Sequence, residues 1–218
     1  MLDERFFDDG DQAAAALAEN LAQALRDGIA ARGRASAALP GGRTPGLVLP
    51  HLVGPDRTRP DLPWTAVHLT LTDERRVPVD HPDSNEGMLR RFLTGPAAQA
   101  HLHGLTDATA ACDARIERLR PFDAVFLGFG EDGHIASLFP GSPALDAAGT
   151  CVAAPAAGIG HARLSLTLPA LLDAHRLLLL VVGPAKHRVY AAACAGAALP
   201  LSRILNQDRV PVTVYRTP

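Results

Sequence analysis

Helical periodicity is clearest near the start of the chain, where apolar residues recur every three or four positions. Leu17, Leu21 and Leu25 fall on one face of a helix that Asp11 can cap and that Gly33 would end. Further helices are predicted at 46–52, after the capping-box pair Asp83 and Glu86, at 106–119, from Pro169 and from Gly183.

Strand patterns alternate with these helices. The runs 124–127 and 177–182 are continuously apolar, which is typical of strands buried on both faces. The runs 65–72 and 163–168 alternate apolar and polar residues. The remaining candidates are 35–39, 151–153 and 210–215. This order predicts an α/β fold, with a mostly parallel sheet covered by helices on both faces, in a single domain over residues 1–218.

Polar groups follow four of the predicted strands. They lie at 41–44, at 73–76, at 128–134 and at Lys186. Because the carboxyl ends of parallel strands share one edge of a sheet, we expect these groups to converge there. Open α/β sheets bind ligands at that edge, so the pattern predicts one binding site.

The loop 128–134 reads Gly-Phe-Gly-Glu-Asp-Gly-His, and we expect a helix to begin after it. Its glycines would let the backbone approach a ligand, while Asp132 and His134 can move protons. His134 is the best candidate for a general base, since histidine suits proton transfer near neutral pH. A plain turn with solvated side chains would fit the same residues. We interpret the other eight histidines as surface residues.

The loop 41–45 reads Gly-Gly-Arg-Thr-Pro ahead of a predicted helix. Exposed amides and the helix dipole at such a place favour an anion, and Thr44 adds a hydroxyl donor. The loop lacks the Gly-Lys-Ser/Thr ending of a P-loop and the glycine spacing of a dinucleotide-binding fold. A simple turn is the alternative here too.

Arg163 and Lys186 are candidate cations for the same anion, although each also fits a solvated surface charge. Asp73 and Glu74 could act as acid or base, or could pair with the two arginines that follow them. No group of His, Cys and Asp has the spacing of a structural zinc site, and no nucleophile elbow is present. We therefore expect no metal, no cofactor and no covalent serine or cysteine catalysis.

Composition narrows the class of protein. The chain has 218 residues, is 47% hydrophobic and carries a formal charge of −2 without a basic stripe, which argues against a nucleic-acid partner. Its acidic start is unlike a signal peptide, and its longest aliphatic run is too short to cross a membrane. Three cysteines are typical of free thiols in a reducing compartment. The expectation is a soluble cytoplasmic protein.

Five motifs, taken in order and spacing, closely resemble those of 6-phosphogluconolactonases. They lie at 41–45, at 72–78 with 83–85, at 128–140, at 163–167 and at 183–186, and so span nearly the whole chain. The first departs from the family's common pattern, because Arg43 stands where serine is usual.

That family shares its fold with glucosamine-6-phosphate deaminases, so the resemblance implies a Rossmann-like sheet of this kind. The deaminase pattern continues with Asn-Glu-Pro after the loop histidine, and its glutamate assists that histidine. Here Phe139 occupies the place of the glutamate, which favours a lactonase. A deaminase or sugar-phosphate isomerase is the alternative within this fold, and a non-catalytic sugar-phosphate-binding regulator is the alternative outside catalysis.

The resemblance implies hydrolysis of 6-phospho-D-glucono-1,5-lactone in the oxidative pentose phosphate pathway. His134 would activate water, and Asp132 or Asp73 would orient His134 or the sugar hydroxyls. The expected substrate- and phosphate-binding residues are Gly41, Gly42, Arg43, Thr44, Arg75, Arg163 and Lys186. The expected partner is this small sugar-phosphate lactone, with no nucleic acid and no membrane, and the chain is expected to be a monomer or a weak homo-oligomer.

Overall fold

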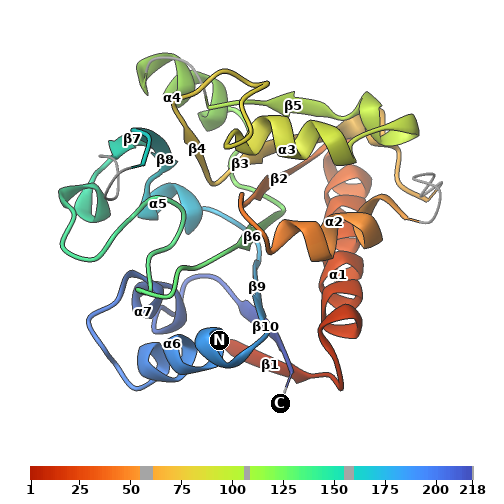
Figure 1. Ribbon diagram of the computed structural model, residues 1–218. Helices are drawn as coiled ribbons and strands as arrows, with labels where there is room; N and C mark the ends of the chain where they lie inside the picture. The colour runs from red at the N-terminus through yellow and green to blue at the C-terminus, as the bar shows by residue number, and fades with distance from the viewer. Residues whose placement is uncertain (55–60, 106–108, 155–159, 218) are drawn as a thin grey trace.

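A parallel sheet forms the centre of the molecule in the computed structural model, which describes residues 1–54, 61–105, 109–154 and 160–217 (Figure 1). Its strand order is β1-β10-β9-β6-β2-β3-β5, and every neighbouring pair is parallel. The strands are β1 (Leu2–Phe6), β2 (Ala35–Leu39), β3 (Val67–Leu71), β5 (His101–His103), β6 (Ala124–Leu127), β9 (Leu177–Val181) and β10 (Val212–Arg216). The predicted mostly parallel α/β fold is confirmed.

Helices cover both faces of this sheet. Figure 1 shows α1, α2 and α3 to one side and α4, α6 and α7 to the other. The helices are α1 (Gly10–Arg32), α2 (Pro45–Val53), α3 (Asn85–Phe92), α4 (Thr109–Glu117), α5 (Leu168–Leu171), α6 (Pro184–Cys194) and α7 (Pro200–Leu205). Single 3₁₀ turns occur at η2 (Trp64–Ala66), η3 (Gly95–Gln99) and η4 (Pro143–Asp146). No helix in the described ranges combines the length and the apolar character needed to cross a membrane.

A second, antiparallel sheet lies beside the carboxyl edge of the first. Its order is β4-β8-β7, formed by β4 (Asp73–Arg75), β8 (Arg163–Leu166) and β7 (Cys151–Ala154). Thr72 joins the two sheets, because its amide bonds to Leu39 of the large sheet and its carbonyl accepts from Leu166 of the small one. The two hydrogen bonds of Thr72 therefore hold β4 and β8 beside the carboxyl ends of the parallel strands.

The core forms where α1 packs on the centre of the large sheet. Leu17, Leu21 and Leu25 are completely buried, as their spacing predicts, and each contributes about 2 kcal/mol of hydrophobic stabilisation. All five residues of β2 are buried, and its small side chains let α1 approach closely. The loops at the edge of the sheet are therefore attached to a tightly packed, fully buried core.

Several local predictions are wrong in detail. The N-cap of α1 is Asp9, whose side chain accepts from the amide of Gln12, and Asp11 lies in the first turn. The N-cap of α3 is Ser84, so Asp83 and Glu86 do not form a capping box. The strands β1, β4 and β5 and the helix α7 were not predicted. Residues 106–108 of the predicted helix at 106–119 lie outside the described residues.

Six of the eight histidines interpreted as surface residues are partly buried, and two of these pair between neighbouring strands. His68 on β3 and His103 on β5 are half-buried, and His68 Nδ1 lies 3.0 Å from His103 Nε2. The His68 ring also stacks on His101 at 4.7 Å. Desolvation, together with the charge of His68, lowers the pKa of His103 to about 4, and desolvation and His101 lower the pKa of His68. Both rings are therefore neutral in the folded protein at pH 7.

This cluster predicts a loss of stability in mild acid. In the unfolded chain His103 binds a proton below its ordinary pKa of 6.5, whereas in the folded protein it stays neutral down to about pH 4. The free energy of unfolding therefore keeps the full contribution of neutral His103 above pH 6.5 and loses it as the pH falls from 6.5 toward 4. Allowing for solvent screening, His103 accounts for about 1–2 kcal/mol of this fall. In urea unfolding at pH 7 and pH 5, His103→Gln should lose less stability on acidification than wild type. An unchanged pH dependence, or an equal effect of His51→Gln on α2, would contradict the assignment.

Candidate active site

A cavity of about 290 Å³ opens at the carboxyl edge of the parallel sheet, where the sequence predicted a site. All four predicted strand-end segments contribute to it. Its lining is Pro40, Gly41, Gly42, Arg43, Thr44, Thr72, Asp73, Arg75, Asn85, Gly128, Phe129, Gly130, His134, Ala136, Arg163 and Lys186. Among the predicted site residues, Asp132 is outside this lining and reaches the cavity through its contact with His134.

The glycine loop between β2 and α2 forms one wall of the cavity. Gly41 packs so tightly on Asn85 that a Cβ atom there would lie 1.9 Å from its side-chain oxygen. Gly42 adopts a φ of 82°, which favours glycine. Thr44 makes no side-chain cap at the start of α2, where the amides of Gly46 and Leu47 donate to the carbonyls of Arg43 and Thr44 at 3.1 Å. The place for an anion is therefore the 41–44 loop itself, just ahead of the positive end of the helix dipole.

His134 and Asp132 form a hydrogen-bonded pair on the opposite loop. Asp132 Oδ1 lies 2.6 Å from His134 Nδ1 and 3.2 Å from its backbone amide. Burial raises the pKa of Asp132, but the His134 amide, charge and ring N–H outweigh it, so the pKa is lowered overall. The ionised carboxylate holds the proton on Nδ1 and leaves Nε2 as an acceptor.

The segment after His134 does not form the helix that was expected. Gly130 donates its amide to the carbonyl of His134 at 2.8 Å, and Leu138 donates to Ile135 at 2.8 Å. Ala136 takes a positive φ of 47° between them. These turns bring the Phe139 ring to 4.5 Å from the His134 ring, so Phe139 packs beside the histidine.

Asp73 belongs to a different network from His134. Its side chain is almost fully buried, accepts from Ser137 Oγ at 2.5 Å and lies 3.7 Å from the Arg163 guanidinium. Of the two carboxylates considered as partners of His134, Asp132 is the one in contact. Asp73 instead contacts Ser137, which is buried outside the cavity lining, and Arg163 within that lining.

Four cationic side chains line the cavity, Arg43, Arg75, Arg163 and Lys186. Arg75 and Arg163 each have a buried Nε without a hydrogen-bond partner in the described structure. Lys186 donates to the carbonyl of Phe129 and lies 4.4 Å from the centre of its ring. Desolvation lowers the pKa of both Arg163 and Lys186. Arg75 adds to the lowering at Arg163 and Arg43 adds to it at Lys186, while Asp73 and Glu131 respectively oppose it. A bound anion would relieve this repulsion and satisfy the free donors.

Glu74 has a structural role that the sequence did not reveal. Its carboxylate, 1% exposed, accepts from the Ser84 hydroxyl and from the amides of Arg75, Asn85 and Glu86. It therefore neutralises the start of α3 and does not line the cavity. Asn85, thus positioned, donates to the Asp73 carbonyl at 2.8 Å and supports Gly41.

Glu74→Gln should destabilise the protein by about 2–3 kcal/mol, because an amide NH₂ would face backbone donors in a buried place. Urea unfolding at pH 7 measures the change. Glu19→Gln on the exposed side of α1, where Glu19 pairs with Arg26, is the matched control and should stay within about 0.5 kcal/mol of wild type. Equal stabilities for the two variants would refute this role of Glu74.

Comparison with known proteins identifies similar chains. The profile of the family described as glucosamine-6-phosphate isomerases/6-phosphogluconolactonase matches residues 8–213. A 6-phosphogluconolactonase of Pseudomonas putida is 41% identical over 94% of this chain and 88% of its own. One from Caulobacter vibrioides is 39% identical over 91% and 90%.

Solved structures show the same similarity. The crystal structure of a 6-phosphogluconolactonase from Shewanella baltica superposes with a TM-score of 0.88 at 33% identity, covering 100% of this chain and 98% of that one. A monomeric glucosamine-6-phosphate deaminase superposes with a TM-score of 0.80 over 97% and 96% of the two chains. At 16% identity this second structure shows a shared fold alone.

Proposed function

Because the chain belongs to the family of glucosamine-6-phosphate isomerases and 6-phosphogluconolactonases, we propose that it hydrolyses 6-phospho-D-glucono-1,5-lactone to 6-phosphogluconate. This is the second step of the oxidative pentose phosphate pathway. The observation that carries the proposal is the His134–Asp132 pair, whose histidine lines one cavity together with the 41–44 loop and four cationic side chains. Such a cavity suits a sugar with a phosphate at one end and a reactive carbonyl at the other.

The phosphate would bind between the 41–44 loop and the cations. Backbone amides of the 41–44 loop would donate to some of its oxygens, and Lys186 and Arg163 would supply charge. Arg43 also borders the cavity and acts on Lys186 electrostatically, which supports a contribution to the same positive field. A phosphate with two negative charges thus compensates a cluster that is otherwise repulsive.

His134 would serve as the base at the other end. A water oxygen forms a bond to C1 of the lactone while its proton passes to Nε2, and Asp132 stabilises the resulting imidazolium. The C1–ring oxygen bond then breaks, and the ring oxygen leaves as a hydroxyl by taking this proton back. We assign the developing charge on the C1 oxygen to donors of the cavity wall, with Arg75 as one candidate.

Phe139 supports the lactonase over the deaminase. The family resemblance places it where a deaminase carries the glutamate that assists its histidine, and here its ring packs on His134. A phenyl ring can accept no proton from the imidazole. The carboxylate that contacts His134 is Asp132, on the preceding turn.

The wider setting follows from the same proposal. We propose a cytoplasmic enzyme of one domain, a monomer or weak homo-oligomer, that acts on a diffusing metabolite without nucleic acid or membrane. The alternative of a non-catalytic sugar-phosphate-binding regulator needs the phosphate loop but not the His134–Asp132 pair. It predicts phosphate-ester binding without lactone turnover, so a turnover assay separates the two.

His134→Ala should lower kcat/KM for the lactone by about 10²–10⁴, the usual contribution of a general base. The assay follows acid release and subtracts spontaneous hydrolysis. His51→Ala on α2 is the control and should retain wild-type activity. If the wild type released ammonia from glucosamine 6-phosphate and did not hydrolyse the lactone, the proposed function would be wrong and the protein would be a deaminase.

Lys186→Met should raise KM for the lactone by about 10-fold or more and change kcat less, because it removes a charge that binds phosphate in both ground and transition states. Arg188→Met, on the exposed side of the same helix, is the matched control. Inhibition by inorganic phosphate should weaken in parallel in Lys186→Met alone. A fall in kcat at unchanged KM would show that Lys186 acts on the chemical step instead.

A further inference from the structure

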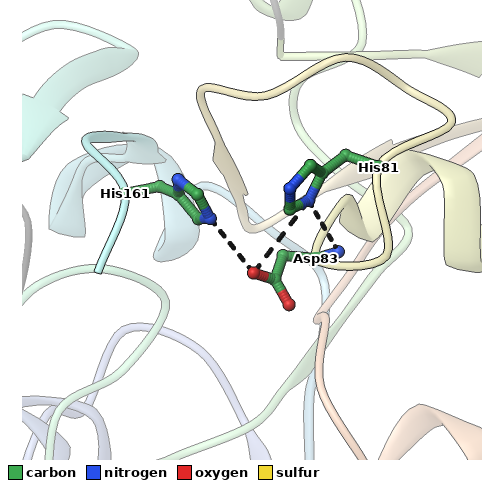
Figure 2. A group of neighbouring side chains, drawn as sticks. All are labelled: His81, Asp83 and His161. Atoms are coloured by element: carbon green, nitrogen blue, oxygen red, sulfur yellow. Dashed lines mark hydrogen bonds and ion pairs between the residues drawn. The ribbon is translucent and has the colours of Figure 1, made fainter. Parts of the chain in front are cut away.

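Three side chains of types that can bind a metal converge beside Arg75 and Arg163, two residues of the cavity lining. His81 and Asp83 lie in the turn that leads from β4 to α3, and His161 lies two residues before β8 (Figure 2). His161 Nε2 lies 3.0 Å from Asp83 Oδ2, although the two residues are 78 positions apart. His81 Nδ1 lies 4.0 Å from the same oxygen, so the carboxylate sits between the two rings.

Backbone contacts hold these two segments together. Arg76 donates its amide to Ala162 at 2.8 Å, which continues the β4–β8 ladder to the residue beside His161. The Asp83 carbonyl accepts from the Arg75 guanidinium at 2.7 Å. Ser84 closes the turn through its amide to the His81 carbonyl at 3.0 Å. The convergence is therefore built into the junction of the small sheet and α3.

The spacing of the three groups fits a transition-metal ion. Zinc bound to imidazole nitrogen and carboxylate oxygen at about 2.0–2.2 Å holds its ligand atoms roughly 3.3 Å apart in a tetrahedron. The contacts at 3.0 Å and 4.0 Å bracket this value, and one ligand atom from each residue lies within 4.8 Å of the others. In the metal-free arrangement a proton between His161 and Asp83 takes the place of the cation.

We propose that His81, Asp83 and His161 form a binding site for a divalent transition-metal ion of the zinc class. Two imidazoles favour such an ion over magnesium or calcium, which prefer oxygen ligands. Three protein ligands leave a coordination position open to water or to an oxygen of a molecule in the cavity. The proposed lactone hydrolysis does not depend on this ion.

Two features limit the affinity. The positive charges of Arg75 and Arg163 lie close by, since the Arg75 guanidinium donates to the Asp83 carbonyl and the Asp83 charge acts on Arg163. His81 Nδ1 also accepts from the Asp83 amide at 3.1 Å, so ligation through this nitrogen must replace that bond. We therefore expect reversible binding that weakens as the pH falls, since protons compete for the same ligand atoms.

The test is a Co²⁺ titration of tag-free protein at pH 7.5, followed by visible absorption and checked by Zn²⁺ displacement. One equivalent should bind, and His161→Ala and Asp83→Asn should each weaken binding by 10-fold or more. His51→Ala is the matched control, because His51 and Asp11 form a comparable pair at 2.9 Å. It should bind Co²⁺ like wild type.

Other sources of binding are distinguished in the same titration. His101→Ala tests the histidine cluster of β3 and β5, and Cys194→Ser tests the exposed thiol. Circular dichroism and thermal unfolding establish that each variant is folded. No binding by wild type, unchanged affinity in His161→Ala, or loss of the site in His51→Ala, His101→Ala or Cys194→Ser would overturn the proposal.

Discussion

The buried carboxylate of Glu74 is the interaction on which the geometry of the cavity depends. Its oxygens accept hydrogen bonds from the amides of Asn85 and Glu86 at the start of α3, and these bonds fix the position of Asn85. Asn85 then ties the Asp73 backbone to one side and touches Gly41 on the other. Through Glu74 and Asn85, the 41–44 loop is thus connected to β4. The Glu74 carboxylate can be buried because its oxygens accept four hydrogen bonds.

Charge is distributed unequally across the cavity. Four cationic side chains line it, Arg43, Arg75, Arg163 and Lys186. Asp73, the buried carboxylate 3.7 Å from Arg163, is already engaged by Ser137. The carboxylate on the other side, Asp132, is committed to His134. We propose that this field orients an anionic substrate as it enters, with its phosphate toward the cations and its other end toward the imidazole.

Local sequence patterns predicted the parallel sheet and the segments that meet at its edge, because buried strands and glycine loops leave local signatures. They missed β1, whose five residues are all exposed and which is held by backbone bonds to β10. They also predicted a helix after His134, where backbone bonds and the positive φ of Ala136 form turns instead.

Contacts between distant residues account for the rest. The role of Glu74 depends on a helix that begins eleven residues later, and Asp83 meets His161 across 78 positions. Contacts between residues so far apart in the sequence leave no periodic pattern of apolar and polar residues. The segments of Asp83 and His161 come together because β4 pairs with β8. The candidate residues of the site could be named from the sequence, but which carboxylate contacts His134 could not.

The central claim is that the His134–Asp132 pair activates water for attack on a sugar-phosphate lactone. The most direct measurement is the pH dependence of kcat/KM for 6-phosphogluconolactone, corrected for spontaneous hydrolysis, in wild type and His134→Ala. The account predicts that the wild-type rate falls as the pH is lowered and that the variant loses this limb along with most of its activity. A variant with the wild-type rate and the same pH profile would contradict it.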